Sequence, residues 1–262
     1  MWSEYTIGIL GGMGSYATLH FFSRILKAFP AEKEWERPRI VINNRCTMPS
    51  RVRAYLYGEK RQELVEMMAE SISILLRMGA DTVILACNTA HLFLDEVKAL
   101  LPETDRDKVI NMIQMCADSL KREGNMARKF YLLATEGTID SRIYQETFKL
   151  AGLEILCPCE TEFPKMRRLI EAVKQNKITA PVKKEFLQML KECSYQNIIL
   201  GCTEFPVLYD AIRGKLGGTE IHVFDPLETA LSLLITQYKQ KRSAEEQRVK
   251  EGKHDLYSNS CV

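Results

Sequence analysis

Two stretches of the chain, VILACNTAH at residues 83–91 and IILGCTEFP at residues 198–206, share one pattern. Each begins with an apolar run that is short enough for a buried β-strand, and each places a cysteine directly after that run. We therefore expect Cys87 and Cys202 at the carboxyl ends of two buried strands. A small polar or hydroxyl residue follows each cysteine, which indicates that a loop begins there.

The rest of the chain alternates expected strands with expected helices. Short β-rich runs, which indicate strands, occupy residues 5–10, 39–44, 82–87, 109–113, 129–135, 154–158, 197–202 and 221–226. Between them apolar residues recur at helical spacing, as in KRQELVEMMAESISILLRMG, which ends at the stop signal Gly79. Strands that alternate with helices pair in parallel, so the sequence predicts an α/β fold.

The two halves of the chain repeat one order of elements, in which the third strand ends in a cysteine. An internal duplication is the simplest account of this repeat. It predicts an N-terminal α/β lobe at residues 1–115, whose final helix can cross over, and a C-terminal α/β lobe at residues 116–225. Residues 226–262 are expected to form a closing helix that packs back on the fold, with a charged tail from Lys239 that either extends the helix or is loose.

The position of the two cysteines has a chemical consequence. Ligands of open parallel α/β sheets bind beyond the carboxyl ends of the strands, where Cys87 and Cys202 are expected. A helix follows each cysteine, and the positive end of a helix lowers the pKa of a nearby thiol. If the lobes face each other about a pseudo-twofold axis, the two thiols approach one ligand from opposite sides.

Two opposed acid–base groups suit the inversion of a carbon stereocentre. One thiolate removes the proton from one face, and the other thiol returns a proton to the opposite face. Hydrogen-bond donors must support the negative charge that grows on deprotonation, and Asn88, Thr89 and Thr203 are candidates. A single buried cysteine is more often a small packing residue. Two cysteines at matched positions favour the acid–base interpretation.

Three other motifs leave alternatives open. His91 can form a cysteine–histidine pair with Cys87 or can simply pack or cap a helix. Glu204 can adjust the titration of Cys202 or serve as an acid at a helix N-terminus. The glycine cluster GILGGMG is not the G-x-G-x-x-G of dinucleotide-binding loops, and no acidic residue ends the next strand, so we do not expect a nucleotide site.

Composition excludes several classes of partner. The 262 residues carry a net charge of +2 and include 46% hydrophobic residues, so neither nucleic acid nor a membrane surface is an expected partner. The N-terminus lacks the features of a signal peptide, which predicts a cytoplasmic location. The eight cysteines are then expected as free thiols, and the C-P-C at Cys157 and Cys159 as packing or surface residues rather than metal ligands.

Several motifs resemble those of the aspartate/glutamate racemases, a family that needs no pyridoxal phosphate. These are TIGILGGMGSYAT, NN…MPSR, GADTVILACNTAH, LLATEGTIDSRIY and GCTEFP, and the resemblance runs from about residue 5 to residue 238. It implies two pseudo-symmetric α/β lobes with the active site in the cleft between them, no cofactor and no metal, a small amino acid as substrate, and a homodimer. The resemblance makes Cys87 and Cys202 the catalytic residues. It places substrate contacts at Met13, Arg51, Asn88, Thr89, Ala90, Thr135, Thr138 and Thr203, with supporting roles for Gly11, Gly12 and Glu204.

Two departures from the family pattern leave the substrate open. Ser50 stands beside Arg51 where relatives have Asp. A lysine that binds the side-chain carboxylate in some aspartate racemases maps, by ungapped counting, onto Phe163, with Lys165 two residues further on. The expected activity is therefore racemisation of aspartate or glutamate, and a neutral or broader range of amino acids is the alternative.

Besides racemisation, two other interpretations remain open: a different cysteine-dependent reaction and a binding protein without catalytic activity. Proteins related to these racemases use cysteine for cis–trans isomerisation, or use one cysteine in decarboxylation. A non-catalytic protein that binds an amino acid is a third interpretation. The presence of both cysteines favours racemisation over either.

Overall fold

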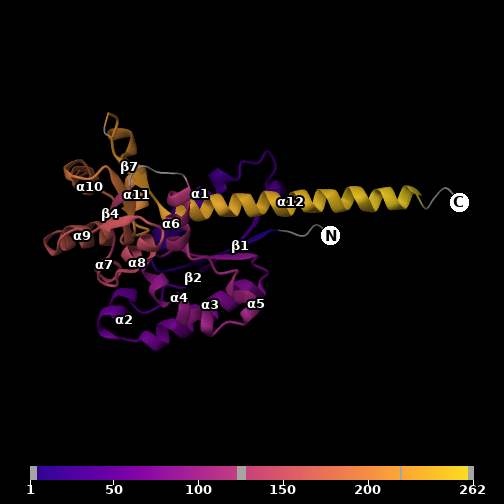
Figure 1. Cartoon of the computed structure of the whole chain (residues 1–262), viewed down its shortest axis with the longest axis horizontal. Helices are drawn as coiled ribbons and strands as arrows, with labels where there is room; N and C mark the ends of the chain where they lie inside the picture. The colour runs from indigo at the N-terminus through magenta and orange to yellow at the C-terminus, as the bar shows by residue number, and fades with distance from the viewer. Residues whose placement is uncertain (1–4, 123–127, 219, 259–262) are drawn as a thin grey trace.

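The computed structural model describes residues 5–122, 128–218 and 220–258. Its strands form two parallel sheets, ordered β2-β1-β3 in the N-terminal lobe and β5-β4-β6-β7 in the C-terminal lobe (Figure 1). The strands are β1 (Thr6–Gly11), β2 (Arg39–Asn44), β3 (Thr82–Leu85), β4 (Lys129–Leu133), β5 (Glu154–Leu156), β6 (Asn197–Leu200) and β7 (His222–Phe224). The prediction of an α/β fold with parallel pairing is confirmed.

Helices follow the strands in both lobes. The first half contains α1 (Ser15–Ala28), η1 (Glu34–Glu36), α2 (Arg51–Tyr57), α3 (Arg61–Arg77), η2 (Thr89–Phe93), α4 (Leu94–Ala99), α5 (Glu103–Arg106) and α6 (Met112–Arg122). The second half contains α7 (Glu136–Asp140), α8 (Ile143–Leu150), η3 (Glu160–Glu162), α9 (Phe163–Lys174), α10 (Ala180–Glu192), α11 (Phe205–Ile212), η4 (Arg213–Lys215) and α12 (Pro226–Ser258). Among the described residues, no helix is both long and apolar enough to cross a membrane.

The prediction of a strand at residues 109–113 is wrong. Only a single bridge between Val83 and Val109 forms there, and α6 begins at Met112. The reason is Asn111, whose side-chain oxygen accepts the backbone N–H groups of Ile113 and Gln114 at 3.2 and 3.1 Å. This cap satisfies the first free donors of a helix and therefore ends the extended segment.

The long helix α12 begins in the core and ends outside it. Leu227, Ala230, Leu231 and Leu234 pack in one buried cluster with β1 and α1 of the N-terminal lobe. Burial of a leucine side chain contributes about 1.5–3 kcal/mol, so this seam holds α12 firmly against the N-terminal lobe. Further along, the helix runs away from the body of the protein toward the C-terminus (Figure 1), and the expected tail is a helix extension as far as Ser258. The last part of that tail, residues 259–262, lies outside the described residues.

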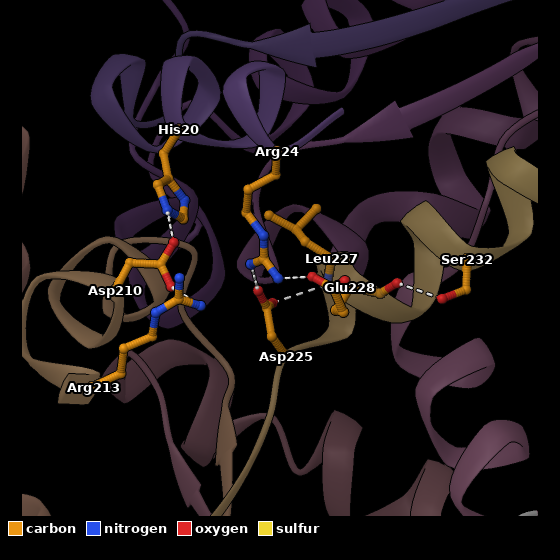
Figure 2. Close-up of polar contacts among 8 residues, drawn as sticks. All are labelled: His20, Arg24, Asp210, Arg213, Asp225, Leu227, Glu228 and Ser232. Atoms are coloured by element: carbon orange, nitrogen blue, oxygen red, sulfur yellow. Dashed lines mark hydrogen bonds and ion pairs between the residues drawn. The ribbon is translucent and has the colours of Figure 1, made fainter. Parts of the chain in front are cut away.

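Ionic contacts join α1 to the C-terminal half of the chain. Arg24 forms ion pairs with Asp225 and Glu228, and His20 contacts Asp210 at 2.9 Å (Figure 2). Burial raises the pKa of Asp225, although the charge of Arg24 opposes that shift. A buried carboxylate needs such a partner, so the start of α12 is held close to α1.

Candidate active site

The loops that follow β3 and β6 meet between the two lobes. Cys87 and Cys202 lie just beyond these strands, with 8% and 6% of their surface exposed. The hydroxyl of Thr203 donates a hydrogen bond of 3.2 Å to the backbone carbonyl of Ala86. Because Thr203 follows one cysteine and Ala86 precedes the other, this bond brings the two cysteine loops together.

Three threonine hydroxyls form a second contact between the lobes. Thr89 comes from the N-terminal lobe, and Thr135 and Thr138 come from the loop after β4 and from α7. Each of the three hydroxyl pairs is separated by 3.0 Å. A hydroxyl can rotate to donate in another direction, so this set can turn toward an anion.

Asn88 lies between Cys87 and this threonine cluster. It is 1% exposed, and its Oδ1 atom accepts a hydrogen bond of 2.5 Å from the hydroxyl of Tyr144 on α8. Its Nδ2 atom is buried and has no hydrogen-bond partner among the described residues. A buried donor without a partner is rare in folded proteins, and at this place it can bind a carboxylate oxygen.

Cys202 and Glu204 form a buried thiol–carboxylate pair. The thiol donates to Oε2 of Glu204 at 2.9 Å. Burial raises the pKa of Cys202 well above its ordinary value, and the charge of Glu204 and this hydrogen bond raise it further. The expectation of a lowered thiol pKa is therefore wrong for Cys202, because burial and the neighbouring carboxylate together outweigh the helix end. The pair can move a proton from sulfur to oxygen.

The amino-terminal end of α1 lies against this pair from the other lobe. A Cβ atom at Gly14, which caps α1, would collide with Oε1 of Glu204, so any larger residue there would displace this carboxylate. That oxygen is buried and has no hydrogen-bond partner among the described residues. The positive end of α1 favours a carboxylate at this position.

Lys174 lies at the end of α9, and its charge interacts with those of Cys202 and Glu204. Burial alone lowers the pKa of Lys174, but the charges of Glu204 and Cys202, together with Glu171, raise it, and the net direction is upward. In turn, Lys174 lowers the pKa of Cys202 slightly against the larger effects of burial and Glu204. Its side chain is 34% exposed and contacts Glu171 at 3.0 Å. Lys174 is thus a positive charge whose field acts on the thiol–carboxylate pair.

A cavity of about 370 Å³ lies between α2 of the N-terminal lobe and α9 of the C-terminal lobe. Lys174, Thr135 and Phe163 line it, together with Ser50 at the start of α2. Neither cysteine lines the cavity, which adjoins the cysteine loops through Thr135 and Lys174. Lys165, in contrast, lines a different cavity beside Tyr131 and Cys193, so the structure separates it from Phe163.

The glycine loop after β1 is held by Arg51. The guanidinium donates to the carbonyls of Met13 at 2.8 Å and of Pro49 at 3.0 Å. Its Nε atom is buried without a partner among the described residues. The hydroxyl of Ser50 caps α2 by accepting the N–H of Arg53 at 3.4 Å, which is the role that Asp also fills at helix starts. The Ser-for-Asp departure therefore preserves the local structure.

Close packing explains the glycines of the same loop. Gly12 has a φ of +82°, and a Cβ there would collide with the backbone of Arg45, so only glycine is tolerated. A Cβ at Gly11 would lie 2.5 Å from the side chain of Thr18. Both glycines let the loop pass close to its neighbours. Met13, at the tip of the loop, is 4% exposed.

His91 has both ring nitrogens engaged by the backbone. The N–H of Met112 donates to Nε2 at 3.3 Å, so Nδ1 carries the proton that it donates to the carbonyl of Cys87 at 3.0 Å. Burial lowers the pKa of His91 to about 4. A neutral, fully bonded imidazole supports the loop and is not available as a base for the thiol of Cys87. Ala90, which precedes it, is buried in the core.

Metal ligands do not gather in the described part of the chain. Within residues 5–122, 128–218 and 220–258, no group of three or more His, Cys, Asp or Glu side chains has the geometry to hold a metal ion.

Comparison with known proteins identifies the family. The fold defines a two-lobed α/β protein with parallel sheets, and the site joins one cysteine loop from each lobe. Residues 10–234 match the family described as Asp/Glu/hydantoin racemase, and the chain therefore belongs to that family. Relatives carry the names of amino-acid racemases, and the protein is accordingly an isomerase.

Individual relatives are similar over most of their length. A broad-specificity amino-acid racemase, RacX, of Bacillus subtilis is 26% identical over 80% of this chain and 90% of its own. A glutamate racemase of Lactobacillus helveticus is 26% identical over 85% of this chain and 76% of its own. The structure of an aspartate racemase of Picrophilus torridus matches with a TM-score of 0.75 and 26% identity, covering 91% of this chain and 98% of that one.

Two residues of the site escaped the sequence interpretation. Lys174 ends an amphipathic helix, where a lysine is an ordinary solvated residue, and ungapped counting pointed to Phe163 instead. Tyr144 lies among the apolar positions of α8, where an aromatic residue normally packs in the core. Its partner Asn88 comes from the other half of the chain. No local sequence signal distinguishes a Tyr144 that only packs in the core from one that also binds Asn88.

Proposed function

We propose that the protein is a cofactor-independent racemase of acidic amino acids, aspartate or glutamate, in which Cys87 and Cys202 act on opposite faces of Cα. The observation that carries the proposal is the hydrogen bond from Thr203 to the carbonyl of Ala86, which joins the two cysteine loops. Geometry of this kind suits a proton removed by one thiolate and returned by the other thiol.

The remaining groups have matching roles in this proposal. Negative charge grows on the α-carboxylate as the Cα proton leaves. The Nδ2 atom of Asn88 and the hydroxyls of Thr89, Thr135 and Thr138 are donors that can support this charge. Glu204 takes the proton of Cys202 when that cysteine must act as the base, since the thiol already donates to it at 2.9 Å.

The preference for an acidic side chain rests on Lys174. A carboxylate in the cavity beside Phe163 and Thr135 meets the ammonium group of Lys174. The two arginines that line the same cavity, Arg53 and Arg167, form ion pairs with Glu59 and Glu136, and Lys174 forms one with Glu171. Lys174 differs from the arginines because its charge also acts on Cys202. A cytoplasmic location and assembly as a homodimer belong to the same proposal, and the family resemblance is the ground for the homodimer.

Racemisation with exchange at Cα is the test of this function. We expect purified protein, incubated in D₂O with single enantiomers of aspartate and glutamate, to form the opposite enantiomer and to incorporate deuterium at Cα. Chiral chromatography measures the first and proton NMR the second. The Cys87→Ser/Cys202→Ser double variant is the control. Binding without exchange would indicate a non-catalytic amino-acid-binding protein instead.

A broader substrate range is the second candidate, and one observation favours it. One wall of the cavity of about 370 Å³ is apolar, with Leu56, Phe163, Met166 and Ile170, while an equal share of the lining residues is polar or charged. Apolar walls of this kind accept neutral side chains of several sizes. RacX, the B. subtilis relative, is named for broad specificity.

Lys174→Met separates the two candidates. A hydrogen bond to a charged group contributes about 1.5–3 kcal/mol, so we expect kcat/KM for aspartate to fall about 10- to 100-fold relative to that for a neutral amino acid. The ratio matters because Lys174 also acts on the pKa of Cys202, an effect common to all substrates. Lys165→Met, in the other cavity, is the matched control. An equal loss for both substrates would remove Lys174 from specificity.

A further inference from the structure

Tyr144 reaches across the lobe boundary to a residue of the candidate active site. It lies on α8, is fully buried, and packs beside Phe148 with ring centroids 5.7 Å apart. Its hydroxyl donates to Oδ1 of Asn88, the residue directly after Cys87, at 2.5 Å. The contact joins residues 56 positions apart in the sequence, and it is the shortest of the bonds that hold Asn88, Thr89 and Thr203 in place.

This contact decides which end of the Asn88 amide faces away from Tyr144. Burial raises the pKa of Tyr144 well above its ordinary value, and nearby Cys116, Asp225 and Cys202 raise it further, so the hydroxyl keeps its proton. No other acceptor for that proton is found among the described residues. The proton must therefore go to Oδ1, and the NH₂ group of Asn88 points the other way.

The NH₂ group then has a distinct position. It is buried and has no hydrogen-bond partner among the described residues, in contrast to the carbonyl end of the same amide. A buried donor in this state is costly unless an acceptor arrives. Between the two cysteine loops, that acceptor is the carboxylate of the amino acid in the proposed function.

We propose that Tyr144 is a positioning residue of the racemase: it holds Asn88 with the NH₂ group toward the α-carboxylate of the substrate. The inference rests on the proposed function. Without the tyrosine hydroxyl the amide can rotate and present Oδ1 to the carboxylate, which repels it. The contribution of Asn88 grows as charge develops on deprotonation, so the effect falls mainly on kcat.

A double-mutant cycle tests this role. Tyr144→Phe keeps the buried ring and removes only the hydroxyl, and we expect a loss of about 10- to 50-fold in kcat, with a smaller change in KM. Asn88→Ala should lose at least as much. In the Asn88→Ala background, Tyr144→Phe should change kcat by less than about twofold, because its only route of action is gone.

The controls separate positioning from packing. Tyr131→Phe removes another tyrosine hydroxyl, which donates to Glu162 at 3.1 Å beside the second cavity, and it should leave kcat unchanged. Should Tyr144→Phe fail to fold, Asn88→Asp is the second variant: it still accepts the tyrosine proton but lacks the NH₂ group, and it should lose at least as much activity as Asn88→Ala.

The outcomes are distinct from those for the proposed function. Absence of racemisation by the wild-type protein rejects that function and this inference with it. An active wild-type racemase rejects only the role of Tyr144 if Tyr144→Phe keeps its kcat, if its loss persists in full in the Asn88→Ala background, or if Asn88→Asp retains parental activity.

Discussion

Cys87→Ser and Cys202→Ser should each reduce racemisation by about 10³-fold or more. A serine hydroxyl is a much weaker acid than a thiol, and a positioned acid or base contributes about 10²–10⁴-fold to a rate. Because inversion needs one proton removed and another returned, loss of either thiol blocks the full reaction. Racemisation is symmetric at equilibrium, so kcat/KM must fall equally for both enantiomers.

Exchange without inversion distinguishes the two cysteines. Each single variant retains one thiol, which can still remove and return the Cα proton on its own face. We therefore expect Cys87→Ser and Cys202→Ser to incorporate deuterium slowly and into opposite enantiomers, as measured by NMR in D₂O. Cys159→Ser is the control, because that exposed thiol contacts Thr161 at 2.9 Å outside the site. A parental rate of racemisation in either single variant would falsify the two-base mechanism.

Glu204→Gln should reduce racemisation by about 100-fold. Cys202 donates to Glu204 at 2.9 Å and its pKa is raised, so at neutral pH it is a thiol with a carboxylate beside it. Proton transfer to Glu204 generates the thiolate that the reaction needs, and a glutamine of the same shape cannot accept this proton. Steady-state rates with both enantiomers measure the loss.

In the same variant, Glu204→Gln, we expect the reactivity of the Cys202 thiol to increase although racemisation falls. Burial raises the pKa of Cys202 first, and the charge of Glu204 and its hydrogen bond raise it further, so removal of that charge should lower the thiol pKa. The pH dependence of alkylation at Cys202 should move to lower pH while racemisation falls. If Glu204 acted only by suppressing the thiolate, both reactivity and racemisation would increase. Glu162→Gln, whose carboxylate lies 3.5 Å from the thiol of Cys159, is the matched control.

Much of the fold was predictable because its signals are local. The apolar runs that precede Cys87 and Cys202 form β3 and β6, and every expected strand except residues 109–113 is present in the described chain. That exception also has a local cause, the capping side chain of Asn111, which the apolar residues around it concealed. The periodicity of apolar residues and the residues that end a strand depend on a few neighbouring positions, so a single sequence is enough to recognise them.

For the candidate site, the sequence indicated which residues take part but not how they interact. Residue type and position after a strand selected the two cysteines, Asn88, Thr89 and Thr203 as candidates, because they indicate chemistry at a sheet edge. Thr135 and Thr138 were added by the family resemblance, and Glu204 was left between two roles. Their catalytic roles stay predictions. The direction of the pKa shift at Cys202 was misjudged, because a helix end is visible in the sequence, whereas the complete burial of the thiol and the orientation of the Glu204 carboxylate are not.

Only the tertiary structure decided which residues of one lobe act on those of the other. Tyr144 reaches Asn88, Gly14 lies against Glu204, and the charge of Lys174 acts on Cys202, although each pair is far apart in the chain or joins different lobes. Hydrogen bonds and charges depend on distances of a few ångströms and on burial from water. Sequence patterns determine which elements form and which residues end them, but the docking of two lobes sets those distances.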